Sequence, residues 1–138
     1  MEAIMATESQ RGVGLRQGLV AGLIAGVVAA LAGVVTLLIM QAITGNSYPE
    51  LTPLTVTGIA LVANLAGGLL YAILTRFVAR PVLWYAVIAL VAATLDSLLS
   101  IVNPLHPGFG TIATPLHYVV AGISIALVPR LAARLAAR

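Results

Sequence analysis

The chain has 138 residues, of which 61% are hydrophobic and only 8% are charged, whereas about 25% of the residues in a typical soluble domain are charged. So little polar surface excludes a water-soluble globule and predicts a single-domain membrane protein whose first partner is the lipid bilayer. The net charge of +3 comes from arginines that separate apolar runs, which excludes a nucleic-acid-binding face, and the absence of cysteine excludes disulfides and thiolate metal sites.

Four apolar runs are each long enough to cross a bilayer core of ~30 Å, which takes about 20 helical residues. Their length and the lack of apolar–polar alternation exclude β-strands. We expect an all-α fold, an up-down-up-down four-helix transmembrane bundle. The predicted spans cover about residues 18–40, 54–75, 82–102 and 111–128.

The same pattern divides the chain into three parts. Residues 1–17 are expected to form a short cytoplasmic N-terminal segment, 18–129 the transmembrane domain and 130–138 a basic cytoplasmic tail. The first apolar run is longer than the core of a signal peptide, so we interpret it as an uncleaved span. The short loop at about 76–81 predicts that the second and third spans are antiparallel neighbours.

Small residues recur along one face of several spans. In the first span they are Gly18, Gly22, Gly26 and Gly33, which would let another helix approach closely. This pattern favours packing within the chain and leaves a contact with a second copy open. In the second span one face carries Ala60, Asn64, Gly68 and Tyr71, and in the fourth His117, Ala121 and Ser124.

Prolines are expected to mark helix boundaries. Thr52 and Thr114 each precede a proline and resemble N-caps followed by a proline in the first turn, and Pro81 is expected to begin the third span in the same way. Pro129 is expected to bend or end the fourth span.

The arginines predict the orientation in the membrane. They precede the first span, lie between the second and third, and follow the fourth, whereas residues 41–52 and 103–110 contain none: Arg11, Arg16, Arg76, Arg80, Arg130, Arg134 and Arg138. The positive-inside rule therefore predicts a multi-pass protein of the inner (plasma) membrane with both termini in the cytoplasm. Trp84 and Tyr85 are expected in the aromatic belt at the cytoplasmic interface.

An aspartate interrupts the third span, in the segment VAATLDSLLSIVN at residues 91–103. An aspartate that faces lipid costs about 2.5–3.5 kcal/mol on insertion scales, so we expect Asp96 to point into the bundle. At ~1.5 Å per residue, His117 and Asn64 lie in a similar layer. We hypothesise a buried polar cluster of these three residues, with Ser100 joining from the same helix.

Two interpretations of this cluster stay open. It either fixes the register of the helices, or titrates near neutral pH in a proton or ion path. One intramembrane histidine is too few for a metal or haem, so we expect neither a metal nor a cofactor. Glu50 and His106 are expected to be solvated in the outer loops, where a metal site together with Asp96 is a remaining alternative.

Several short motifs resemble a family of short bacterial four-span membrane proteins known only as a domain of unknown function. The resemblance rests on LTPLTV at 51–56, TRF at 75–77, the serine-containing outer end of the third span and PLHYVVAG at 115–122. It covers the chain from about Gly18, and His117 matches a histidine typical of that family. The segment NPLHPGFGT has no counterpart there. The resemblance implies a four-helix bacterial membrane protein and brings no activity.

The sequence contains no HExxH, no GxSxG and no glycine-rich phosphate loop, so we expect no enzyme. The favoured function is that of a non-enzymatic structural or accessory component of the membrane. The alternative is an oligomeric proton- or ion-coupled transporter or channel that uses Asp96 and His117. A homo-oligomer or a second membrane protein is the expected partner besides lipid.

Overall fold

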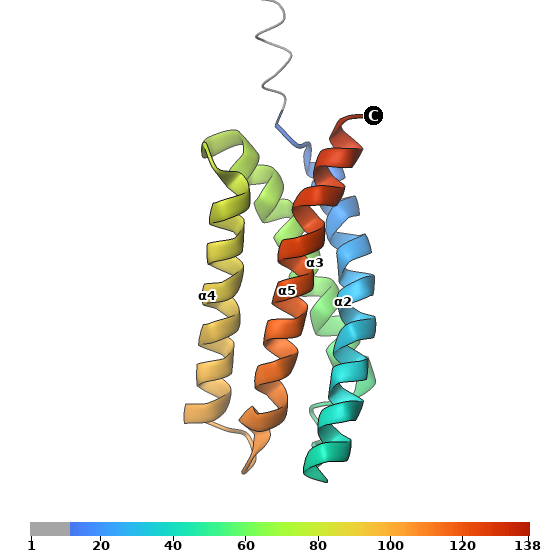
Figure 1. Cartoon of the computed structure of the whole chain (residues 1–138), viewed down its shortest axis with the longest axis vertical. Coiled ribbons are helices and arrows are strands. Elements are labelled where there is room, and N and C mark those ends of the chain that lie inside the picture. Colours follow the sequence, from blue (N-terminus) through green and yellow to red (C-terminus); the bar gives the residue numbers. More distant parts are fainter. Residues whose placement is uncertain (1–11) are drawn as a thin grey trace, which may run out of the picture.

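The computed structural model describes residues 12–138, which form four helices and no strand (Figure 1). Arg11 and most of the predicted N-terminal segment lie outside the described residues. The helices are α2 (Leu15–Thr44), α3 (Pro53–Phe77), α4 (Pro81–Val102) and α5 (Phe109–Ala136). Each is long and apolar enough to cross a membrane, which confirms the predicted all-α fold and indicates a multi-pass membrane protein.

The helices run alternately up and down, as predicted. The start of α2, the loop between α3 and α4 and the end of α5 lie together at the top of Figure 1, and the other two loops lie at the bottom. The backbone N–H of Val13 donates to the Thr75 hydroxyl, which ties the start of α2 to the end of α3. The arginines of the described residues therefore belong to one end of the bundle: Arg16, Arg76, Arg80, Arg130, Arg134 and Arg138.

Glycine allows α2 and α3 to approach each other closely. The four glycines singled out in the first span all lie against α3: Gly18, Gly22, Gly26 and Gly33. A Cβ atom on Gly22 would overlap the backbone carbonyl oxygen of Asn64, and one on Gly68 in α3 would overlap that of Gly18. Helices associate in lipid through such backbone contacts. The glycine face is therefore used within the chain.

Helix α4 is the least buried of the four. Only Tyr85, Ala93 and Ser97 are buried in it, whereas α2 has nine buried residues. It runs antiparallel to α3 as predicted, but it packs mainly on α5, and Figure 1 shows α5 between α4 and α2. The short loop therefore connects α3 and α4 in the sequence, but the two helices make little contact with each other.

Two of the three proposed proline starts are confirmed. Thr52 caps α3, since its hydroxyl accepts from the backbone N–H of Thr55 while the Thr55 hydroxyl accepts from the backbone N–H of Thr52, and Pro53 occupies the first turn. Pro81 is the first residue of α4. In both helices the proline lies in the first turn, where a backbone N–H would have no hydrogen-bond acceptor within the helix.

The predicted N-cap at Thr114, with Pro115 in the first turn, is wrong. The helix begins at Phe109, after Gly108 with a φ of 78°, and Pro115 lies inside it. Ile112 is buried in a cluster with Leu37 and Val56, so packing keeps the turns before the proline helical. In membrane helices, neighbouring helices and small local adjustments compensate the hydrogen bond that a proline removes.

Of the two outcomes expected at Pro129, a bend or an end of the helix, the end is absent. Helix α5 continues through Pro129 to Ala136 and takes most of the predicted basic tail with it. Val128 and Ala132, on either side of the proline, are both fully buried in the cluster nearest the arginine-rich end. Burial on both sides of Pro129 therefore outweighs its tendency to end the helix.

Candidate binding cavity between three helices

Helices α3, α4 and α5 line an open cavity of about 650 Å³, together with residues of the two arginine-free loops. This volume lies within the range of about 300–1,000 Å³ that is usual for small-molecule sites. The lining is almost entirely apolar, and residues of α3 and α4 that border it remain exposed, with Ile59 65% and Ile88 38% exposed. The cavity therefore opens sideways between α3 and α4, towards the position of the lipid.

Tyr85 occupies the end of the cavity nearer the arginines. It is 2% exposed, its hydroxyl shares a hydrogen bond with the Ser124 hydroxyl, and its ring meets the ring of Tyr71 edge-on at 5.5 Å. A Cβ atom on Gly67 would clash with this hydroxyl. Tyr85 therefore faces the bundle interior and bridges α4 to α3 and α5, while Trp84 is 51% exposed. The aromatic belt at the cytoplasmic interface stays a prediction for both residues.

The structure brings three of the four residues of the predicted polar cluster to the cavity. Asn64 from α3, Asp96 from α4 and His117 from α5 all line it. Ser100 does not line it, and its hydroxyl donates to the backbone carbonyl of Asp96 in its own helix at 2.8 Å.

The prediction that Asp96 is buried is wrong for the isolated chain. Its side chain is exposed, and it forms no hydrogen bond or ion pair within residues 12–138. The buried stripe of α4 is Tyr85, Ala93 and Ser97, at multiples of four residues. One residue turns a helix by about 100°, so Asp96 points to the side of this stripe, where the cavity opens.

His117 pairs with Ser97 instead of with Asp96. Its Nδ1 lies 3.2 Å from the Ser97 hydroxyl oxygen, and that hydroxyl donates its proton to the backbone carbonyl of Ala93 at 2.7 Å. The predicted polar cluster omitted Ser97, because the small-residue stripe was followed through Asp96 and Ser100. The spacing of four from Ala93 to Ser97 is the signal that finds it.

Asn64 is fully buried and only half satisfied. Its Nδ2 donates to the backbone carbonyl of Ala60 at 2.9 Å, while its Oδ1 has no hydrogen-bond partner. A buried acceptor without a partner costs about 1–3 kcal/mol. The amide therefore leaves an unmet acceptor beside the apolar lining.

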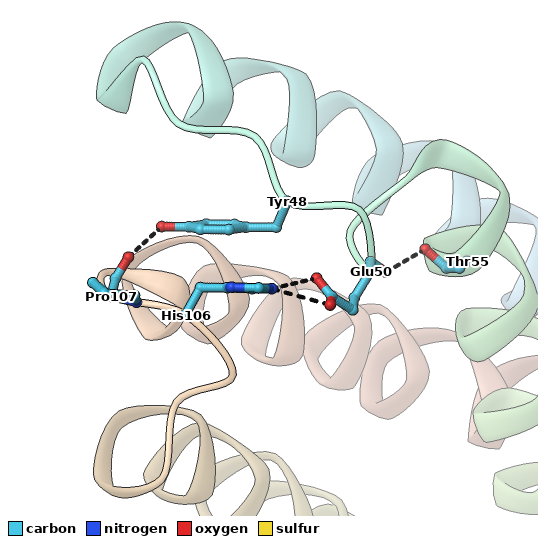
Figure 2. Close-up of polar contacts among 5 residues, drawn as sticks. All are labelled: Tyr48, Glu50, Thr55, His106 and Pro107. Carbon is cyan, nitrogen blue, oxygen red and sulfur yellow. Dashed lines mark hydrogen bonds and ion pairs between the residues drawn. The ribbon is translucent and has the colours of Figure 1, made fainter.

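A clasp joins the two arginine-free loops, and Figure 2 shows its side chains. Glu50 of this clasp also lines the cavity, at the end away from the arginines. The Nε2 atom of His106 lies 3.0 Å from both carboxylate oxygens of Glu50, and the imidazole stacks on the ring of Tyr48 at 5.5 Å. The Tyr48 hydroxyl donates to the Pro107 carbonyl at 2.7 Å, and the Thr55 hydroxyl to the backbone carbonyl of Glu50 at 2.8 Å.

The clasp was not predicted, because its two halves are 56 residues apart in the sequence and neither has a motif. We expected Glu50 and His106 to be solvated separately. They remain partly exposed, but they form an ion pair when the imidazole is protonated. Within residues 12–138 no third histidine, aspartate or glutamate joins them in a group that could hold a metal, so Asp96 is not part of an outer metal site.

Acid is expected to weaken this clasp. The hydrogen bond from His106 is the main cause that lowers the pKa of Glu50 from its ordinary value of 4.5. Since the pKa is lower in the folded chain than in the unfolded chain, the pair stabilises the fold above the unfolded value. That contribution is lost as the pH falls through the folded pKa.

The variant Glu50→Gln should therefore melt below the wild type near neutral pH and converge with it under acid conditions. Melting temperatures in detergent across this range measure the effect, and His106→Gln should reproduce it. A difference between wild type and Glu50→Gln that stays constant with pH would contradict the assignment.

Comparison with known proteins places the chain in a family. It matches a family of unknown function (DUF6069) over residues 6–135. Neither a curated protein nor a solved structure shows significant similarity to it. Since the match runs from before α2 to the last turn of α5 and includes the whole cavity, the chain belongs to this family of unknown function, DUF6069.

Proposed function

We propose that the protein is a non-enzymatic membrane protein that binds a small, mainly apolar molecule, which it takes sideways from the bilayer. The observation that carries this proposal is the cavity of about 650 Å³ that opens between α3 and α4. Sites for small molecules are typically apolar with a few polar groups that fix orientation, and this cavity has that character. Such binding is also the first step of the transport alternative.

The polar groups of the wall favour a binding site over a structural pin. A polar pair that only fixes helix register is satisfied within the bundle, whereas within residues 12–138 the Asp96 carboxylate has no partner. A carboxylate without a partner carries an energetic cost in a membrane helix. An occupant of the cavity that pairs with Asp96 removes part of this cost.

The orientation belongs to the same proposal. Arginines gather at the end of the bundle where α2 begins and α5 ends, and the loops at the other end carry none. By the positive-inside rule both termini lie in the cytoplasm, and the clasp of Glu50 and His106 lies on the outer side. The membrane is then the inner (plasma) membrane of a bacterium, in keeping with the family that the motifs resemble.

The experiment is to fill the cavity and measure what the protein retains. Ala92 lines the cavity from α4, and Ala126 of α5 is exposed but does not line it. Wild type, Ala92→Phe and Ala126→Phe are purified in lipid nanodiscs, and bound small molecules are identified by native mass spectrometry. We expect Ala92→Phe to lose the bound molecule and Ala126→Phe to keep it. Equal retention by all three proteins would refute the proposal.

A second candidate is that of an accessory component in an assembly. The observation in its favour is that α4 has only three buried residues, so most of its surface is not covered by the other three helices. Gentle extraction followed by mass spectrometry tests it directly. A stable second polypeptide or a second copy bound to the chain would favour this candidate, and a monomer would count against it.

A further inference from the structure

We infer that the molecule bound in the cavity carries a protonated amine on an apolar body, because the wall offers hydrogen-bond acceptors and negative charge but no cation. This inference rests on the proposed function and names the class of ligand that the site takes. Of the lining residues none is arginine or lysine, and two are acidic: Asp96, and Glu50, which already pairs with His106 in the clasp.

Asp96 is the group that an amine would meet first. Its carboxylate borders the side opening and has no partner in the described chain. An isolated carboxylate is costly away from water unless it is paired or takes up a proton. An ammonium group supplies both a positive charge and hydrogen-bond donors to the Asp96 carboxylate. The two groups can pair as ions, or as neutral groups after the ammonium has transferred a proton to the carboxylate. A carboxylate ligand would instead place two negative groups together.

His117 is set to accept a hydrogen bond as well. The Ser97 hydroxyl has one proton, and it is used on the Ala93 carbonyl. The short contact between Ser97 and His117 Nδ1 therefore requires Nδ1 to donate. A neutral imidazole with its proton on Nδ1 has a bare Nε2, which accepts. The serine thus selects the tautomer that suits a donor ligand.

The other polar groups of the lining do not change this polarity beside Asp96. Asn64 uses its amide donor on the Ala60 carbonyl, and its unpaired Oδ1 is fully buried, so it presents neither a donor nor an acceptor to the cavity. The hydroxyls of Tyr85 and Ser124 bond to each other at the end of the cavity nearer the arginines, where the hydroxyl that accepts keeps its own proton. The spare groups beside Asp96, its own carboxylate and His117, therefore accept, and a ligand must donate to satisfy them.

The apolar lining fits the rest of such a molecule. The lining extends from Val56 to Leu70 on α3, fourteen residue steps or ~21 Å at 1.5 Å per residue, and from Tyr85 to Asp96 on α4, eleven steps or ~17 Å. An alkyl or aromatic body can lie along this length. The same ammonium chemistry occurs in free lipophilic amines and in the headgroup of phosphatidylethanolamine, so the test separates these two sources.

The test compares headgroups on one alkyl chain. The full chain is placed in phosphatidylcholine nanodiscs, and binding of dodecylamine, dodecanol and dodecanoate is measured by isothermal titration against empty nanodiscs. We expect dodecylamine to bind at least about tenfold more tightly than dodecanol, as hydrogen bonds to charged groups imply, and dodecanoate to bind most weakly. Asp96→Asn should remove most of the preference for the amine. Ser100→Ala, on the same helix but outside the cavity, should keep it.

The outcomes separate the two proposals. If no dodecyl compound binds, the proposed function fails. If the three compounds bind with equal affinity, the cavity binds amphiphiles but the inference of an amine is overturned, as it is if dodecanoate binds best. Nanodiscs that contain phosphatidylethanolamine identify the source. Loss of dodecylamine binding there would assign the site to the lipid headgroup, and unchanged binding would assign it to a free amine.

Discussion

Replacing Gly22 by alanine is expected to destabilise the bundle by about 3 kcal/mol, the upper end of the usual cost of overpacking. The added Cβ atom would overlap the carbonyl oxygen of Asn64 and come within 3.1 Å of the Leu65 Cα atom. Both are backbone atoms, so no side chain can rotate away and α2 must move from α3. Because Asn64 also lines the cavity, we expect this variant to lose ligand as well as stability.

The chain provides a matched control in the same helix pair. A Cβ atom on Gly58 of α3 would meet nothing within 4 Å. Gly58→Ala should therefore be neutral or slightly stabilising, since alanine is the better helix former. Unfolding of the three proteins in mixed micelles measures the difference. Equal stability of Gly22→Ala and Gly58→Ala would show that the close approach of α2 and α3 is not needed for the fold.

The parts of the fold that the sequence predicted depend on one helix at a time. Span length and apolar content give four membrane-crossing helices whatever their partners are. The face of Ala60, Asn64, Gly68 and Tyr71 was expected from spacing alone, and all four residues are buried in α3. Thr52 and Pro53 act within a single turn, so the start of α3 was also predicted correctly.

The parts that were missed depend on how helices meet. The rotation of α4 about its axis decides whether Asp96 or Ser97 faces inward. The two residues are adjacent, and the pattern of apolar residues in α4 does not choose between them. Packing of Ile112 on Leu37 extends α5 upstream of Pro115, which local rules would not allow. The clasp of Glu50 and His106 joins two loops that only the finished bundle brings together.

Replacing Asp96 by leucine is expected to affect insertion and binding in opposite directions. Insertion scales assign about 2.5–3.5 kcal/mol to an aspartate and a small gain to leucine at the centre of a membrane helix. Asp96 lies six residues from the end of α4, so we expect α4 to insert more favourably by about 2–3 kcal/mol. The same variant should lose the preference for an amine ligand.

A translocon insertion assay on α4 measures the first effect, with Thr94→Leu as the control, because Thr94 is an exposed polar residue of the same helix that does not line the cavity. The control should gain much less, since a hydroxyl costs little beside a carboxylate. If the insertion free energy of Asp96→Leu improves no more than that of Thr94→Leu, the carboxylate does not oppose insertion even without a ligand. A large gain together with the loss of amine binding would mean that the chain keeps an expensive residue at the mouth of the cavity because the ligand needs it.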